Sequence, residues 1–215
     1  MASNQGVLVF AEVNDGKLTA VAKEGIGLAT QLGGGVSCLV IGEGTEVIGG
    51  ELAAAGAEQV YTFEDPSLAT YQPDAYLQIL EQAVAAYSPK VILMGHTDTA
   101  KDLAPKLAFR LGAGLTMDCV ELSTEGSKLV ATKPVYGGNA RASFETDTPI
   151  QMATIRAKAF EPLSDPPSQG LISPLEATVN QEAIRVRVLE VKKEESSGLR
   201  LEDAPVVVSG GRGLG

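Results

Sequence analysis

The stretch VLVFAEVNDGKLTAVAKEGIGLATQLGGGVSCLVI, residues 7–41, decides the fold of this chain. Its two ends, residues 7–12 and 36–41, are short apolar runs of the kind found in strands buried on both faces. Between them a helix is expected to begin at Thr19 and to end at three glycines, residues 33–35. The stretch therefore predicts a strand, a crossover helix and a second, parallel strand.

The same alternation continues to Gly112. In order come an Ala-rich helix ending near Gly56, a strand around residues 60–63, a helix opened by Pro73, a strand over residues 91–94 and a helix stopped by Gly112. Since Pro105 is tolerated only in a first turn, this last helix is expected to begin close to Lys101 and Asp102. Such alternation predicts a mainly parallel sheet that helices cover on both faces.

The second half of the chain has a different pattern. Residues 115–156 hold four β-prone runs, over residues 115–122, 129–136, 141–145 and 150–156. Turn-forming residues separate these runs, so we expect antiparallel strands that extend the sheet or cover one of its edges.

Hairpin-like turns are expected at residues 125–127 and 137–139. Further on, a Pro/Ser-rich stretch, residues 162–174, leads into an alternating run, residues 184–189. This alternation predicts one more strand.

An apolar run, residues 206–209, predicts a last strand, and it leads into the glycine-rich residues 210–215. Dinucleotide-binding units begin in this way, because glycine lets the backbone approach a pyrophosphate closely. We therefore expect the chain to be the front part of a larger cofactor-binding protein. The expected divisions are an α/β domain over residues 1–190, a linker over residues 191–205 and the truncated start of a cofactor-binding domain over residues 206–215.

Composition excludes several classes of protein. The formal net charge is −10, from 17 Lys and Arg against 27 Asp and Glu, and no basic stripe is present, so nucleic-acid binding is not expected. A single His makes a His/Cys metal site unexpected, and Cys38 and Cys119 are expected to be buried, inert thiols. The sequence shows no signal peptide, no transit peptide and no apolar run near the about 20 residues of a membrane span. We therefore expect a cytoplasmic protein that is not embedded in a membrane.

Several polar residues follow predicted strands, where the sites of parallel sheets collect. His96 is a candidate general base, but the sequence has no GxSxG motif and no Cys close to it, so a polar loop residue is favoured. Glu12, Asp15 and Asp118 are expected to be solvated or to cap helices. No catalytic residue is predicted.

Glycine-containing loops offer weak nucleotide-binding signals. Residues 42–44, Gly-Glu-Gly, favour a plain strand-to-helix turn, and the chain has no GxxxxGK[ST] motif. Residues 209–211 lack the following Asp of the ATP pyrophosphatase loop. Arg212 is different, because a long cation between glycines has little structural use, whereas its planar guanidinium suits an anionic cofactor.

Several segments together resemble the alpha subunit of electron transfer flavoproteins. The most specific are PVYGGN, residues 134–139, and SGGRGL, residues 209–214. The order and spacing of the segments match over essentially the whole chain. The full set is residues 101–114, Asp118 with Cys119, and residues 133–140, 152–156 and 207–214.

The resemblance implies a three-layer α/β/α domain, adenine-nucleotide hydrolase-like, that supports the interface with a beta subunit and does not itself hold the flavin. In that family the C-terminal domain binds FAD and begins at the motif where this chain ends. The chain is therefore expected to be the N-terminal domain, truncated at the start of the FAD-binding domain. Arg212 aligns with an FAD-contacting arginine, but the remaining flavin-binding segments are absent, so this chain alone is expected to bind no cofactor.

For the full-length protein, the resemblance implies an electron carrier rather than an enzyme. It would take electrons from dehydrogenases, such as acyl-CoA dehydrogenases, to a membrane quinone reductase or to ferredoxin, with the redox chemistry supplied by FAD. Two alternatives stay open. A nucleotide-binding, stress-protein-like domain of similar fold would need a phosphate-gripping loop where residues 12–16 offer acids, and a hydrolase using His96 would need a nucleophile.

Overall fold

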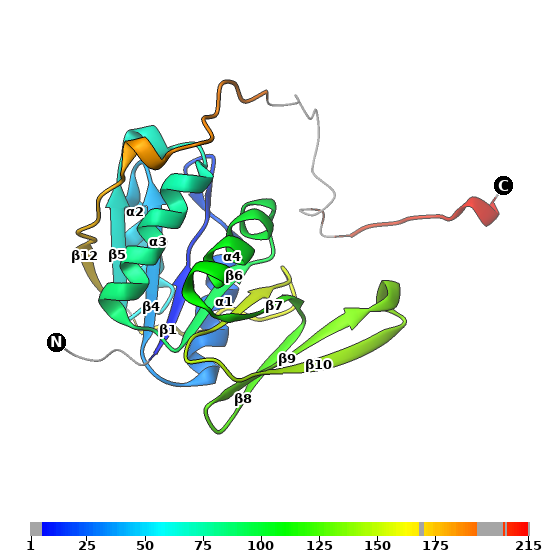
Figure 1. Ribbon diagram of the computed structural model, residues 1–215. Coiled ribbons are helices and arrows are strands. Elements are labelled where there is room, and N and C mark those ends of the chain that lie inside the picture. Colours follow the sequence, from blue (N-terminus) through cyan, green and yellow to red (C-terminus); the bar gives the residue numbers. More distant parts are fainter. Residues whose placement is uncertain (1–5, 168–169, 193–203, 205, 215) are drawn as a thin grey trace.

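The computed structural model describes residues 6–167, 170–192, 204 and 206–214. At its centre is a sheet of seven parallel strands in the order β12-β5-β4-β1-β6-β11-β7 (Figure 1). The strands are β1 (Val7–Phe10), β4 (Val36–Gly42), β5 (Gln59–Glu64), β6 (Val91–Gly95), β7 (Gly114–Cys119), β11 (Gln151–Ile155) and β12 (Leu171–Pro174). The predicted parallel sheet is confirmed.

Helices cover both faces of this sheet. Helices α1 (Ala20–Leu32) and α2 (Thr45–Ala54) pack on one face, and α3 (Pro73–Tyr87) and α4 (Asp98–Leu111) pack on the other. Every residue of β1, β4 and β6 is buried, and successive residues of β1 point to opposite faces, as a pleated strand requires. The continuous apolar runs thus identified strands that are buried from both sides.

A second, three-stranded antiparallel sheet extends from the domain (Figure 1). It consists of β8 (Glu121–Glu125), β9 (Lys128–Val135) and β10 (Ala140–Thr146), and we call it the arm. Both predicted turns are present: Gly126 has φ +62°, and Gly137 and Gly138 have φ +67° and +93°. A short hairpin of β2 (Val13–Asn14) and β3 (Lys17–Leu18) follows β1.

Two of the runs expected to be antiparallel belong instead to the parallel sheet. Strand β7 follows α4 as the end of a right-handed crossover, which makes it parallel to β6. Strand β11 then returns from the arm and enters between β6 and β7. The run over residues 115–122 is divided between two strands: β7 passes through a bulge at Asp118, which has φ +64°, and pairs for the last time at Cys119, and β8 begins at Glu121.

Helix α4 begins earlier than predicted. Thr97 is its N-cap, and the Thr97 hydroxyl accepts a hydrogen bond of 3.2 Å from the amide of Ala100. Pro105 therefore lies in the helix interior, where it removes one backbone hydrogen bond. The cap at Thr97, rather than the proline, determines where the helix starts.

The connection from β11 to β12 crosses the outside of α1 and α2 to the opposite edge of the sheet. It approaches α1 closely at Gly27, where an added Cβ would lie 2.2 Å from the carbonyl oxygen of Glu161. The Pro/Ser-rich stretch thus ends in an edge strand, β12, that was not predicted. Pro174 fits there because an edge strand leaves one row of amides unpaired.

After β12 the chain runs along α3, held by glutamine side chains. Gln82 both donates to and accepts from the backbone of Thr178, at 2.8 and 3.0 Å, and Gln78 does the same with Asn180, at 3.4 and 2.8 Å. The carboxylate of Asp74 then accepts the amides of Arg185 and Val186. The alternating run of residues 184–189 is not a strand. Its first residues lie against α3 and donate their amides to Asp74, instead of pairing with a neighbouring strand.

The apolar residues 206–209 also do not form a strand. Val206 and Val208 are 77% and 95% exposed, and no strand of the described residues lies beside them. A β-strand needs a neighbour for its backbone hydrogen bonds, so apolar composition is not sufficient. The predicted linker falls mostly in residues 193–203, outside the described residues.

The close contact between Gly27 of α1 and the chain at Glu161 predicts how substitutions at Gly27 affect stability. Replacing Gly27 with Ala should lower the free energy of unfolding by about 1–3 kcal/mol, because the crossing chain at Glu161 must move away. The matched control is Gly50→Ala in α2, where a Cβ meets nothing within 4 Å. That change should raise stability by up to about 1 kcal/mol, since alanine favours helix. Urea unfolding of both variants measures the difference, and equal effects would contradict the prediction.

Candidate functional site

The carboxyl edge of the sheet has its switch point between β1 and β6, from which the chain proceeds in opposite directions. Ligands of open α/β sheets bind in such crevices. Here Glu12 follows β1 and Thr97 follows β6, and the hydroxyl of Thr97 donates to the carboxylate of Glu12. Because Thr97 also caps α4, the Glu12 carboxylate lies at the N-terminus of that helix.

Burial raises the pKa of Glu12 above its ordinary value, and the nearby Asp98 adds to the rise. Hydrogen bonds from Thr97 and Thr99 act in the opposite direction but do not outweigh the burial. The protein's own carboxylate thus takes the position where a bound phosphate would meet the helix N-terminus. Glu12, expected to be solvated or capping, is a half-buried acceptor beside the N-cap of α4.

A carboxylate also lies at a second helix N-terminus of this edge, where it accepts backbone amides directly. The Glu64 carboxylate, at the end of β5, accepts the amides of Gly44 and Thr45 at 2.8 and 2.7 Å and the Thr45 hydroxyl at 2.6 Å. These hydrogen bonds lower the pKa of Glu64, and the bond from the Thr45 hydroxyl has the largest effect. Residues 42–44 are therefore the plain strand-to-helix turn that was predicted, with Gly44 at φ +69°.

Beside this turn lies a cavity of about 410 Å³, lined by the end of β4, the start of α2, the turn of the β2–β3 hairpin, residues 68–69 and Tyr76. Its two charged lining residues, Asp15 and Glu43, are both acidic. An anionic ligand would be repelled there. The described part of this edge therefore lacks the features expected of a nucleotide-binding stress-protein-like domain.

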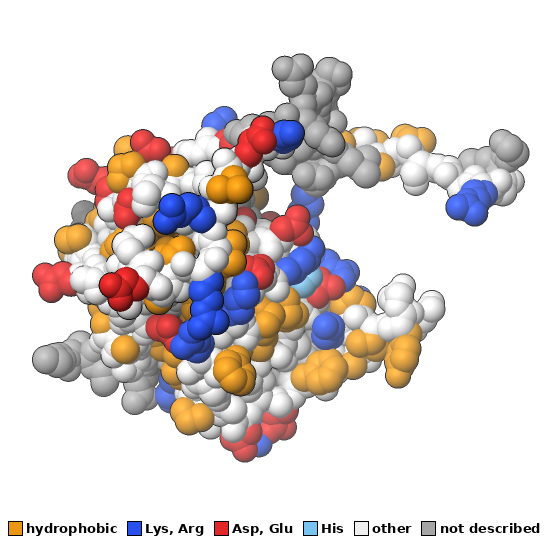
Figure 2. All heavy atoms as spheres, turned by 45° about the horizontal axis from the view of Figure 1, so that its top comes forward, with side chains coloured by type: hydrophobic (Ala, Val, Ile, Leu, Met, Phe, Trp, Pro, Cys, Tyr) orange, Lys and Arg blue, Asp and Glu red, His pale blue; other side chains and the backbone are white. Residues whose placement is uncertain are grey.

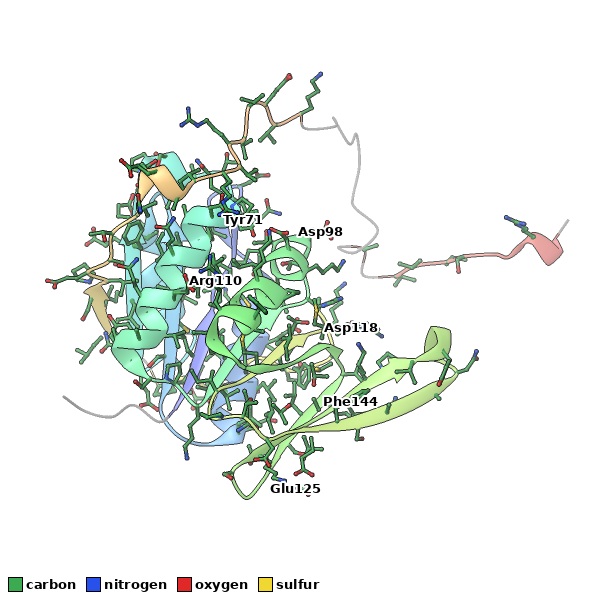
Figure 3. All side chains as sticks on the ribbon, viewed as in Figure 1. Tyr71, Asp98, Arg110, Asp118, Glu125 and Phe144 are labelled. Atoms are coloured by element: carbon green, nitrogen blue, oxygen red, sulfur yellow. The ribbon has the colours of Figure 1, made fainter. Side chains whose placement is uncertain are left out.

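His96, Asp118 and Arg156 form a polar cluster at the ends of β6, β7 and β11 (Figure 3 labels Asp118). Arg156 binds the Asp118 carboxylate with two hydrogen bonds, of 2.9 Å from Nε and 2.7 Å from Nη2. The buried hydroxyl of Thr154 accepts the amide of Asp118 at 2.9 Å and lies 2.8 Å from Nδ1 of His96. Nε2 of His96 lies 4.0 Å from Oδ1 of Asp118, which favours the tautomer with its proton on Nε2.

The electrostatics of this cluster keep His96 neutral. Burial lowers the pKa of His96, and the cations Lys101, Lys133 and Arg156 lower it further, while Asp118 opposes them. The bonds from Arg156 hold the pKa of Asp118 below its ordinary value. Figure 2 shows the imidazole among Lys and Arg side chains. The surface here is more cationic than a chain of charge −10 would suggest.

The side chains beside His96 that could act as nucleophiles, Thr154 and Cys119, are both fully buried. Cys119 is fully buried, and burial raises the pKa of its thiol to about 12, so it is a thiol at neutral pH. Cys38 is also buried, as predicted. Across the described residues, no three His, Cys, Asp or Glu side chains could share a metal ion. Within the same residues, no helix combines the length and apolar character of a membrane span.

Arg212 begins a short 3-10 turn, η5 (Arg212–Leu214), and its side chain is exposed. The flanking Gly211 and Gly213 have no heavy atom within 4 Å of a would-be Cβ, so a ligand could approach the backbone closely. The donor set suits a phosphate or the oxygens of a flavin. The predicted contact of Arg212 with FAD stays a prediction.

The sequence pointed to His96 and Asp118 as single residues. It did not show that Thr154 and Arg156 contact them, or that Glu64 accepts the first amides of α2. A usable signal existed for Glu64. The N-cap of α2 is Gly44, which has no side chain to accept the first amides, so an acceptor must come from a neighbouring strand end. For Thr154 and Arg156 the pairing of β11 with β7 had to be known first.

The comparisons with known proteins agree with one another. The sequence model of the electron transfer flavoprotein domain matches residues 7–191. The chain is 36% identical over its whole length to the electron transfer flavoprotein subunit alpha of Thermoanaerobacterium thermosaccharolyticum, covering 67% of that protein. It is 35% identical to the same subunit of Bacillus subtilis, over 97% of the chain and 64% of the relative. The chain thus spans about two thirds of the length of these curated relatives.

A further relative carries a more specific name. The subunit LctC of the lactate dehydrogenase (NAD(+),ferredoxin) of Acetobacterium woodii is 31% identical to the chain. The match covers 98% of the chain and 52% of that protein.

Because His96 is the only histidine, one imidazole proton resonance reports on the cluster. In an NMR titration His96 should titrate below 6.5, and Asp118→Asn should lower its pKa further by removing the one opposing charge. Lys133→Gln should raise it, because a cation is removed. A midpoint at or above 6.5 in the native protein, or an unchanged midpoint in Asp118→Asn, would contradict the electrostatic influence of the neighbouring charges on His96.

The buried Glu12 predicts a pH-dependent stability. The pKa of Glu12 is higher in the folded protein than its ordinary value of 4.5. The free energy of unfolding should therefore fall as the pH rises from 4.5 through the pKa of the folded state, because the unfolded chain releases this proton first. Glu12→Gln cannot ionise and should gain stability relative to the native protein over that range, with the difference smallest below pH 4.5. Urea unfolding between pH 4 and about 8 measures it. The exposed Glu58→Gln serves as control and should show no such trend.

Proposed function

This chain belongs to the electron transfer flavoprotein family, and from that membership we propose that it is the supporting and docking part of a heterodimeric electron carrier. The observation that carries the proposal is the match of the alpha-subunit sequences to the entire chain. In this role the chain binds a beta subunit and performs no catalysis of its own.

The side chains at the carboxyl edge of the sheet favour a scaffolding role for this domain. Glu12 lies beside the N-terminus of α4 at the switch point, Glu64 accepts the first amides of α2, and the charged residues of the adjacent cavity are acidic. A domain that bound a nucleotide there would need these groups replaced by glycines and cations. We therefore place the cofactor outside residues 1–190, with residues 191–205 as linker and residues 206–215 as the start of the flavin-binding part.

FAD is the proposed cofactor of the full-length protein. Arg212 and its glycine neighbours would hold a phosphate or ring oxygen of the flavin. When bound, FAD supplies the one- or two-electron chemistry, and the protein positions and tunes it. Residues 6–167 and 170–192 contribute a scaffold and an interface.

The proposed electron donors are dehydrogenases such as acyl-CoA dehydrogenases, and the proposed acceptor is a quinone reductase or ferredoxin. The name of the Acetobacterium woodii relative, which includes ferredoxin, supports the second acceptor. We place the protein in the cytoplasm, in keeping with its ordinary globular composition.

Co-purification with the beta subunit, combined with an absorbance scan, tests this function. We expect a stable, colourless complex, because the chain docks while the flavin site lies elsewhere. A yellow complex that loses its colour in Arg212→Ala would show that residues 206–215 already hold flavin, contrary to the proposal. Failure to form any complex would refute the docking role. Titration of the isolated chain with adenine nucleotides should show no binding, and saturable binding would favour the stress-protein-like alternative.

A further inference from the structure

The arm has two faces of different character. Residues opposite each other in antiparallel strands share a face, so the pairings Leu122 with Ala131 and Ala131 with Phe144 define one face across all three strands. We call it the inner face, because at its base it packs on the domain core. Its apolar members are Leu122, Leu129, Ala131, Val135, Ala140, Ala142 and Phe144.

The outer face is mostly polar, with Val130 and Pro134 as its apolar members on β9, and its polar side chains pair with one another. Arg141 pairs with Glu121 at 2.6 Å across the arm, and the hydroxyls of Thr132 and Ser143 lie 2.8 Å apart. Lys128 pairs with Glu145. This face has the charged and hydroxyl side chains of a surface that remains in water.

The inner face remains apolar beyond the point where the domain covers it. Leu129 and Ala131, near the base, are 1% and 0% exposed and belong to the core. Phe144, one strand farther out, is 44% exposed (Figure 3), and nearly all of β10 is exposed. A small sheet of this kind is marginally stable without a hydrophobic covering on one face. The alternation therefore indicates a face that another surface covers.

At the tip, the backbone presents an aromatic ring to solvent. Tyr136 is 84% exposed and has φ +53°, a conformation that costs energy for a residue with a side chain. It is held there by Asn139, whose amide groups donate to the Tyr136 carbonyl at 3.0 and 3.3 Å, and by two glycines with positive φ. The motif PVYGGN thus builds a rigid turn that exposes a tyrosine, the residue type most favoured in binding hot spots with Trp and Arg.

Charge indicates the chemistry of the partner. Lys133 is the charged residue of the inner face, and it lies close enough to His96 and Asp118 to shift the pKa of both. Arg156 is paired with Asp118 and Lys101 with Asp98, whereas Lys133 has no ion pair among the described residues. A partner should therefore bring a carboxylate opposite Lys133 and an apolar patch opposite Phe144. A second copy is disfavoured, because two chains of charge −10 repel each other.

We propose that the inner face of the arm, with Phe144 at its middle, Tyr136 at its tip and Lys133 beside them, is the docking surface for the partner subunit, through an apolar patch edged by carboxylates. This inference rests on the proposed function and names the surface that function uses.

The test measures the affinity of the beta subunit for this chain and for single variants, by surface plasmon resonance. Phe144→Ser and Tyr136→Ser should each weaken binding by about tenfold or more. The matched control is Phe109→Ser on α4, since Phe109 is 86% exposed but lies outside the arm, and it should change affinity less than about twofold. Lys133→Glu should weaken binding and reduce its dependence on salt, because an attractive charge pair becomes repulsive.

Hydrogen exchange of the native protein makes the test independent of how the variants fold. On adding the beta subunit, the amides of β10 should become protected, while those of the other exposed edge, β12, should not. If the native chain binds and these variants bind equally well, or if protection falls on β12, the docking surface is wrong while the proposed function stands. If the native chain does not bind, the proposed function fails. A chain dimer in sedimentation that Phe144→Ser abolishes would assign the surface to a second copy and overturn the proposal.

Discussion

The hydrogen bond between Thr97 and Glu12 joins the end of the central strand β1 to the first turn of α4, at the point where the sheet changes direction. The same Thr97 hydroxyl accepts the amide of Ala100 and so caps α4. The bond to Glu12 therefore places a carboxylate of the protein itself at the N-terminus of this helix, where a negative charge is stabilising.

Local sequence patterns were enough to predict most of the fold. The buried strands β1, β4 and β6 and the helices between them follow from apolar runs, glycines and Pro73. The start of α4 was missed because of a local cap at Thr97. The other wrong predictions share one cause, because each depended on how residues distant in the sequence pair. The direction of β11 depends on its place between β6 and β7, and residues 184–189 follow α3 because Asp74 accepts their amides.

The dependence on contacts between distant residues also explains which parts of the site could be predicted. His96 and Asp118 could be named from their places after strands, but a sequence does not show that β11 brings Thr154 and Arg156 between them. The two occupied helix N-termini were missed because their acceptors, Glu12 and Glu64, come from other elements. Resemblance to a family, by contrast, reached the correct membership from PVYGGN and SGGRGL, segments whose chemistry could not be derived from periodicity.

The arm leaves the sheet at the end of β7 and comes back at the start of β11, and these two strands are neighbours. Its connections to the sheet are thus confined to one pair of adjacent strands. An insertion of this kind can lengthen, shorten or change its sequence over generations while the seven-stranded core keeps its pairing. The outer part of the arm, beyond the core residues Leu129 and Ala131, can therefore change without altering any strand pairing of the central sheet.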